Sequence, residues 1–327
     1  MLSEAEIIKK VQQAMNSVAA GVYGIGDDAA ILPLNDMTSY VISKDLLVED
    51  THFRLRYFEP ENLSHKALHV NLSDLAAMGA TPQFVLLGLS IPQDLDQGWI
   101  DTFLEGFVGE CKKQEISLIG GDTTLSQHGL FISATVIGQA QKAHLKFRNR
   151  AQPGEILCVA GPLGEAGAGL VALEKGISGL ESLKERVLRP EALIQEGIWF
   201  GKQQKVTAMM DISDGLYIDL SRLCQASCVG ASIELSTLKP SPTLLEGCQQ
   251  MGLDPLECML TGGEDYALLM TIEADDYPTL AKDFKERFEY SLITIGKTTK
   301  NHSIILTQDG LLTSFAYTPF SHFKELG

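Results

Sequence analysis

Acidic residues recur along this chain at the ends of apolar strands and next to glycines. The set comprises Asp27 and Asp28 in GIGDDAAI, Asp45 in VISKDLLVED, Asp74 in NLSDLAAMGA, Asp122 in LIGGD, Asp211 and Asp214 in MDISDGL, and Glu264 and Asp265 in TGGED. A carboxylate buried without a partner is so unfavourable that such residues are rare. Few lysines or arginines lie near these acids in the sequence, so we expect a metal ion to neutralise several of them.

The donor types indicate which metal this would be. The set has oxygen donors, no cysteine and few histidines, and such sets select hard cations, of which Mg²⁺ is the commonest partner of carboxylates and phosphates. No twelve-residue calcium loop of the EF-hand type is present. Asx turns and helix caps explain each acidic segment taken alone, and an exposed position on its helix explains Asp74. The segments taken together favour a shared metal site.

The glycines beside these acids indicate contact with an anion, because backbone N–H groups without side chains can cradle phosphate. The segment GIGDDA fits a loose dinucleotide pattern, but it follows a helix, and its two aspartates would repel a pyrophosphate. P-loop, HRD, DFG and GxSxG motifs are absent, and His65 and His69 lack the glutamate of HExxH, so we expect core or surface positions for both. Phosphoryl transfer needs screened, positioned substrates and no covalent nucleophile, which suits the acidic set.

Alternating helices and strands must position these residues. Helices are predicted from Ser3, from Pro60 to Gly79, through Trp99 to Cys111, near Leu170, from Pro190 and from Asp214, and strands at 40–48, 83–91, 116–119, 130–137, 156–160, 206–212, 232–235, 266–272, 292–295 and 303–306. Apolar residues four apart, from Trp99 to Cys111, predict a core stripe. The polar stretch around 146–154 contains a Pro-Gly pair and predicts the boundary between two domains.

Length and charge narrow the class of protein. A chain of 327 residues exceeds the usual size of one core, which favours two domains. The net charge of −16 disfavours nucleic acids and anionic membranes as partners. No apolar run approaches the length of about 20 residues that a membrane span needs, and the charged, amphipathic start predicts a cytoplasmic protein. The six scattered cysteines are expected to be reduced thiols.

The motifs GIGDDAAI, ISKDLLVEDTHF, ALHVNLSDLAAMGATP, LIGGDTT, MDISDGL and LTGGEDYALL occur in this order over nearly the whole chain. In this respect the sequence resembles the thiamine-monophosphate kinase family of the aminoimidazole ribonucleotide synthetase-like superfamily. The resemblance implies an α/β plus α+β fold of two domains, with the N-terminal sheet forming a barrel across a homodimer. It implies an N-terminal dimerisation and ATP/Mg-binding domain at 1–145 and a C-terminal α+β domain at 146–327. The implied reaction moves the terminal phosphoryl group of ATP directly to thiamine monophosphate.

The resemblance also implies roles for single residues. Expected Mg²⁺ ligands are Asp28, Ser43, Lys44, Asp45, Asp74, Asp122, Asp211 and Asp214, among which Asp74, Asp122 and Asp211 are the expected catalytic residues. Expected contacts to ATP are Gly121, Asp122, Arg148 and Ser213, and expected contacts to thiamine monophosphate are His52, Glu264 and Phe320. An arginine offers a planar fork to phosphate oxygens, and an aromatic residue can cover a ring face.

One position departs from the family pattern. Lys44 stands where many relatives have a small hydroxyl residue, so a side-chain ligand there would be replaced by a lysine charge, whereas a backbone ligand would be kept. Two alternatives remain for the whole chain. One is an ATP-dependent synthetase of the same superfamily, although a selenophosphate synthetase is disfavoured because the first 110 residues contain no cysteine. The other is a non-catalytic metal-binding module.

Overall fold

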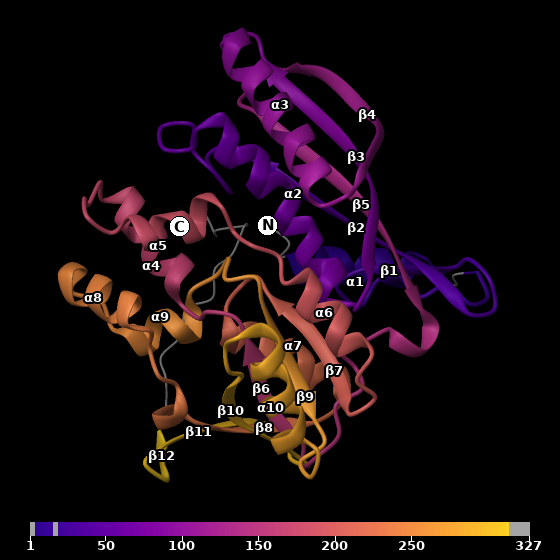
Figure 1. Cartoon of the computed structure of the whole chain (residues 1–327), viewed down its shortest axis with the longest axis vertical. Coiled ribbons are helices and arrows are strands. Elements are labelled where there is room, and N and C mark those ends of the chain that lie inside the picture. The colour runs from indigo at the N-terminus through magenta and orange to yellow at the C-terminus, as the bar shows by residue number, and fades with distance from the viewer. Residues whose placement is uncertain (1–3, 16–18, 314–327) are drawn as a thin grey trace.

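The computed structural model describes residues 4–15 and 19–313, which form two sheets with helices packed around them (Figure 1). The first sheet has five strands in the order β1-β2-β5-β3-β4. Their bounds are β1 Ala30–Pro33, β2 Thr38–Val48, β3 Thr81–Pro92, β4 Ser117–Ser126 and β5 Phe131–Gln141. Only the β3/β4 pair within this sheet is parallel. The predicted strands of this half are therefore confirmed, and β1 is an addition.

The second sheet has seven strands in the order β12-β11-β8-β10-β6-β9-β7. Their bounds are β6 Ile156–Ala160, β7 Val206–Ile212, β8 Gly230–Glu234, β9 Ala267–Ile272, β10 Ile293–Thr299, β11 Ile304–Gln308 and β12 Leu311–Thr313. The helices of this half are α4 Glu165–Glu174, α5 Glu181–Leu188, α6 Ile194–Gly201, α7 Leu216–Ser227, α8 Pro242–Met251, α9 Pro255–Thr261 and α10 Tyr277–Phe288. Strands β6, β9 and the terminal strand β7 are buried along almost their whole length, so this end of the sheet is covered on both faces.

Helices α2 (Pro60–Ala77) and α3 (Gln97–Lys113) pack beside the first sheet (Figure 1). Helix α1 (Glu4–Ala14) reaches the segment before β1, where Gln12 Nε2 donates to the Ile25 carbonyl at 3.3 Å. Proline at the first helical position starts α2 as predicted, and the Asp96 side chain caps α3 by accepting from the N–H of Trp99. Phe103, Phe107 and Cys111 of α3 are buried, which confirms the predicted core stripe.

Helix α2 joins the two halves. It packs against β2, β3, β5 and α3 of the first half and against α5, α6, β7 and β9 of the second. Fifteen of its 18 residues are buried, so it has almost no solvent-facing side. Its approach to α6 requires glycine at Gly197, because a Cβ there would lie 2.2 Å from the carbonyl oxygen of Ala76. Residues on α2 can therefore contact side chains from either half.

The prediction of a helix beginning at Pro190 was wrong, since α6 begins at Ile194. The four residues before it are tied to α2: the Pro190 carbonyl accepts from His65 Nε2 at 2.9 Å, and the Ala192 N–H donates to His69 Nδ1 at 3.2 Å. The stretch around 146–154 is also anchored, because the buried Lys146 donates to the carbonyls of Gln203 and Val206. Both connections hold the halves together.

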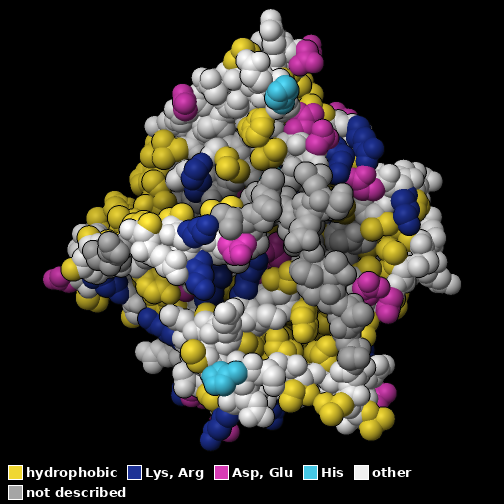
Figure 2. Space-filling model, turned by 180° about the vertical axis from the view of Figure 1, so that it is seen from behind, with side chains coloured by type: hydrophobic (Ala, Val, Ile, Leu, Met, Phe, Trp, Pro, Cys, Tyr) yellow, Lys and Arg dark blue, Asp and Glu magenta, His cyan; other side chains and the backbone are white. Residues whose placement is uncertain are grey.

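The first sheet and its margins expose apolar side chains. They include Met37, Leu46, Leu118, Ile119, Leu125 and Phe131, of which the first five are more than two-fifths exposed. Strand β4 is exposed along almost its whole length and forms one edge of the sheet. Figure 2 shows hydrophobic side chains gathered on the side of the molecule where this sheet lies. Within residues 4–15 and 19–313, no helix is both long enough and apolar enough to cross a membrane.

Candidate active site

Three carboxylates from distant parts of the chain meet at the seam between the two halves. Asp28 lies just before β1, Asp74 lies on α2 and Asp211 lies near the end of β7. One oxygen atom of each lies within 4.8 Å of the others. The Asp28 and Asp211 side chains are nearly inaccessible to solvent. We name this set, Asp28, Asp74 and Asp211, the carboxylate cluster.

The surroundings of the cluster oppose negative charge. Burial raises the pKa of each of the three carboxyl groups, and the neighbouring carboxylates raise the pKa values of Asp28 and Asp74 further. Burial, together with the charge of Asp211, also raises the pKa of Asp45 to about 6. Asp28 Oδ2 is buried and has no hydrogen-bond partner. The cluster therefore favours either protons or a bound cation.

Hydroxyl and amide groups orient these carboxylates. Ser43 Oγ donates to Asp74, and Ser73 Oγ donates to Asp211 Oδ2 at 2.7 Å. The backbone N–H of Asp45 donates to Asn71 Oδ1 at 2.8 Å. Because Asn71, Ser73 and Asp74 lie on one stretch of α2, this helix holds β2 on one side and β7 on the other. These contacts place the predicted residues Ser43 and Asp45 beside the cluster.

Arg148 supplies positive charge at the same place. Its guanidinium pairs with Asp28 and lies 3.4 Å from Asp27 Oδ1, and its backbone N–H donates to Asp27 at 3.2 Å. The Arg148 side chain is only 17% exposed, so these charges are poorly screened by water. One arginine does not balance the whole acidic set, and Arg148 Nε has no hydrogen-bond partner.

The turn that follows β7 is fixed by a second ionic network. The buried Asp219 accepts from the N–H groups of Ser213 and Asp214, both at 3.0 Å, and pairs with Arg222 at 2.7 Å. Arg222 also pairs with Asp214 at 2.6 Å. Burial raises the pKa of Asp219 to about 7. Asp214 thus lies in a rigid turn before α7 and not inside the helix, and Gly215 has a φ of 113° there.

The structure does not bring Gly121 and Asp122 to the carboxylate cluster. Both are exposed on β4, where Asp122 pairs in register with Gly88 and accepts from the N–H of Thr123. Strands β5 and β3 separate β4 from β2, which places the two strands about 14 Å apart. Lys44 is exposed as well and donates to Ser133 Oγ on β5. Since side chains alternate along a strand, Lys44 points away from the face that carries Ser43 and Asp45.

The residues expected to bind the second substrate lie on separate elements. Glu264 Oε1 pairs with Lys66 Nζ at 2.7 Å, and the Glu264 N–H donates to the Ser213 carbonyl at 2.7 Å. His52 Nδ1 accepts from the N–H of Val48 at 3.0 Å in the turn after β2. Phe320 lies outside the described residues. The contact to Ser213 joins Glu264 to the turn that carries Asp214.

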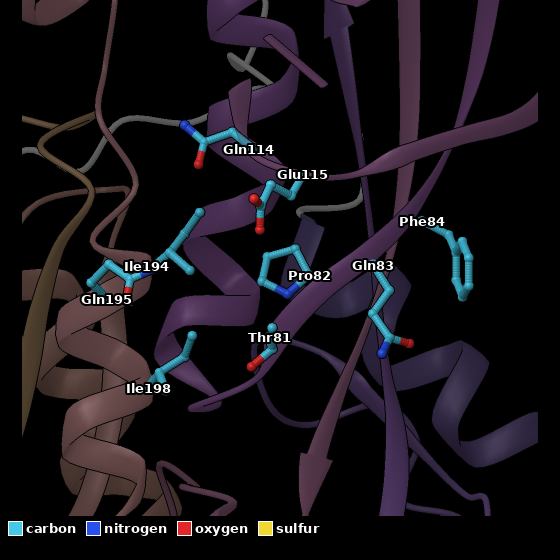
Figure 3. Close-up of a pocket in the computed structure, with 9 residues that line it drawn as sticks. All are labelled: Thr81, Pro82, Gln83, Phe84, Gln114, Glu115, Ile194, Gln195 and Ile198. Atoms are coloured by element: carbon cyan, nitrogen blue, oxygen red, sulfur yellow. The ribbon is translucent and has the colours of Figure 1, made fainter. Parts of the chain in front are cut away.

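Two other features of the structure are distinct from the cluster. His65, His69 and Glu110 lie close enough to suggest a metal site, but the lone pair of His65 Nδ1 faces Arg189 at 3.0 Å and that of His69 Nδ1 accepts from Ala192. This group therefore serves as buried polar packing between the halves, as expected for core histidines. A cavity of about 400 Å³ opens between β3, the end of α3 and α6 (Figure 3). It is lined by Thr81, Pro82, Gln83, Phe84, Gln114, Glu115, Ile194, Gln195 and Ile198, none of which was an expected site residue.

Sequence reasoning missed several residues that hold the site in place. Ser73, Lys66 and Arg222 each pair with an expected site residue. Ser73 and Lys66 have a signal in the sequence, because residues i, i+7 and i+8 share one face of a helix. A lysine one such step from Ser73 and Asp74, directly before the helical segment ALHVNL, indicates a buried charge with a partner elsewhere. Arg222 has no comparable signal.

Comparison with known proteins gives consistent matches over the whole chain. Residues 26–140 match the family model "AIR synthase related protein, N-terminal domain", and residues 152–309 match "AIR synthase related protein, C-terminal domain". The chain is 34% identical to thiamine-monophosphate kinase of Haemophilus influenzae over 99% of each chain. It is 36% identical to thiamine-monophosphate kinase of Escherichia coli K12 over 76% of each chain.

Solved structures agree with these matches. The structure of AaThiL complexed with AMPPCP and TMP is 30% identical, with a TM-score of 0.85 over 98% of this chain and 97% of that one. Thiamine-monophosphate kinase from Stenotrophomonas maltophilia is 33% identical, with a TM-score of 0.76 over 95% of this chain and 99% of that one. The two-domain fold is thereby confirmed, and the chain belongs to the thiamine-monophosphate kinase family.

Proposed function

We propose that this protein transfers the terminal phosphoryl group of ATP to the phosphate of thiamine monophosphate, giving thiamine diphosphate and ADP. Membership of the family supports the reaction, and a relative has been solved with AMPPCP and TMP together. The observation that carries the proposal is the convergence of Asp28, Asp74 and Asp211 from both halves at one seam. Several carboxylates at one seam can bind a divalent cation, and that cation can in turn bind the phosphates of a nucleotide.

The residues present fit Mg²⁺. The donors are all oxygen atoms, Asp28 Oδ2 is buried with no partner, and the three carboxyl groups have raised pKa values that a divalent charge would reverse. Asp28, Asp74 and Asp211 would hold the ion, with Ser43, Asp45, Asp214 and the backbone of Lys44 as further proposed ligands. Asp122, the remaining expected ligand, lies on β4 away from the cluster and would have to bind a separate ion. Bound there, Mg²⁺ would supply the positive charge that lets two anionic phosphates approach each other.

We propose that the residues of the protein bind ATP and thiamine monophosphate and orient their phosphates. The described part of the site offers no positioned nucleophile and base, so we propose direct in-line attack by the thiamine phosphate oxygen. Arg148 would turn its fork toward phosphate oxygens of ATP, with Gly121, Asp122 and Ser213 as the other nucleotide contacts. His52, Glu264 and Phe320 would hold thiamine monophosphate. Asp122 and Gly121 lie across the sheet from the cluster, so a long nucleotide would have to span that distance.

We also propose that the protein is a homodimer. The exposed apolar face of the first sheet and its edge strand β4 resemble an interface, because a long unpaired edge and a large apolar patch are unusual on a monomer. Pairing of two such sheets would form the expected barrel, with 1–145 as the dimerisation domain and 146–327 as the second domain. All six cysteines are free thiols, which supports a cytoplasmic location.

A substrate-dependence assay tests the function. ADP should form only when ATP, Mg²⁺ and thiamine monophosphate are all present, and the product should be thiamine diphosphate by mass spectrometry. ADP formed without the thiamine substrate would favour another ATP-dependent synthetase of the superfamily. Metal binding without turnover of any phosphate acceptor would favour a non-catalytic module.

A further inference from the structure

Lys66 is a buried cation at the seam between the halves. Its side chain has no exposed surface, and its ammonium lies 5.2 Å from the centre of the Phe58 ring. A lysine is almost never fully buried unless its charge is paired. Its partner is Glu264, whose Oε1 lies 2.7 Å from Lys66 Nζ. The ion pair therefore joins α2 to the loop between α9 and β9.

Glu264 is the accessible member of this pair. Its side chain is 27% exposed, and it borders a narrow hollow of about 40 Å³ together with Pro162, Pro190 and Leu193. Its backbone has a φ of 65°, a conformation that residues other than glycine rarely adopt. The N–H of Glu264 donates to the Ser213 carbonyl. Lys66 thus fixes a carboxylate that the loop presents to solvent.

The same helix sets the distance from Glu264 to the carboxylate cluster. Lys66 precedes Ser73 and Asp74 by seven and eight residues, so all three project from one face of α2. Lys66 and Ser73 both reach partners in the second half, Glu264 and Asp211. At a rise of 1.5 Å per residue, eight residues correspond to about 12 Å along the axis. A ligand with a phosphate at one end and an aminopyrimidine at the other has the shape to connect the two positions.

We propose that Lys66 is a positioning residue for thiamine monophosphate, because its ion pair holds Glu264 on α2 at a fixed distance from the carboxylate cluster. The inference rests on the proposed function and adds a residue that acts through Glu264 without touching the substrate. Removal of the ammonium frees the Glu264 side chain to rotate and leaves its charge unpaired beside buried surface. The aminopyrimidine end of the substrate then loses a fixed acceptor, whereas the phosphate end keeps its contacts.

The experiment compares Lys66→Met with the wild-type protein, measuring kcat and KM for each substrate and the Kd of thiamine monophosphate by calorimetry. We expect KM and Kd for thiamine monophosphate to rise about tenfold or more, the range for loss of a hydrogen bond to a charged group. KM for ATP should stay within about twofold. Lys66→Arg keeps the charge and should recover most of the affinity. Lys66→Met in a Glu264→Gln background should add little to the effect of Glu264→Gln alone.

Lys146→Met is the matched control, since Lys146 is also a buried lysine at the seam but donates only to backbone carbonyls. It should lower the melting temperature and leave the Kd of thiamine monophosphate unchanged. An unchanged Kd in Lys66→Met, or additive effects in the double variant, would overturn this inference and leave the proposed function standing. If Lys66→Met does not fold, failure of Lys66→Arg to keep the wild-type Kd overturns it. A wild-type protein that neither binds nor phosphorylates thiamine monophosphate overturns the proposed function as well.

Discussion

Replacement of Asp211 by asparagine should have opposite effects on stability and activity. The substitution removes one negative charge from the carboxylate cluster and keeps an oxygen that can accept from Ser73 Oγ, now 2.7 Å from Asp211 Oδ2. Without metal, this charge is unfavourable because burial raises the pKa of Asp211 and the Asp28 and Asp74 carboxyl groups lie close by. We therefore expect the metal-free Asp211→Asn variant to be more stable than the wild type.

The structure sets the size of this effect. Two full charges 4.8 Å apart, the limit of separation within the cluster, repel by about 3.5 kcal/mol at an effective dielectric constant of about 20. Protons bound at the cluster already relieve part of this repulsion, so we expect a net gain of about 1 to 2 kcal/mol in the free energy of unfolding. That gain corresponds to a rise of about 1.5 to 3 °C in melting temperature for a chain of this length. Turnover should fall about 100-fold or more, because the charge needed to hold a cation is reduced.

Scanning calorimetry in the presence of a chelator measures the first effect, and a coupled ADP assay with Mg²⁺ measures the second. Asp219→Asn is the control, since the Asp219 carboxylate accepts from two N–H groups and pairs with Arg222. This variant should be destabilised, because an amide nitrogen would face donors there. A metal-free Asp211→Asn protein that is less stable than the wild type, or one with near wild-type turnover, would refute the reasoning.

Three further outcomes are expected. The pKa values of Asp28 and Asp74 are raised, and that of Asp45 is raised to about 6. The metal-free folded state therefore keeps protons that the unfolded chain releases, and its melting temperature should fall as the pH rises from about 4 to about 7. Mg²⁺ should reduce this fall in calorimetry, and a rise with pH would contradict it. A chelator should abolish ADP formation, and added Mg²⁺ should restore it; activity that survives chelation would exclude the metal requirement. Leu46→Asp or Leu125→Asp should convert a dimer into a monomer in sedimentation analysis, and an unchanged mass would place the interface elsewhere.

Local pattern and motif order predicted much of this molecule. Strands at 156–160 and 206–212 have the predicted bounds, because short, continuously apolar runs leave little freedom in assignment. The motif residues Asp28, Asp74 and Asp211 lie together, as expected from the cost of burying several carboxylates without a shared cation. Helices α5, α8, α9 and α10 were not predicted, since the amphipathic or capped stretches that form them are short.

What the sequence could not supply was the direction of side chains across the seam. Asp122 belongs to the same kind of glycine-acid motif as Asp28, yet its strand lies at the far edge of the sheet. Strand order depends on long-range pairing, which no local pattern encodes. The position of Lys66 on its helix indicates a buried charge, but only the packing of the second half against α2 shows that its partner is Glu264. Such pairings depend on tertiary structure.

Helix α2 also limits how the gene can change. Each residue turns an α-helix by about 100°, so inserting or deleting a single residue between Lys66 and Ser73 would rotate one anchor away from the second half while the other stayed in place. No compensating twist is open to a helix with 15 of 18 residues buried. Length variation among natural or engineered variants should therefore be absent from this segment and confined to the surface loops.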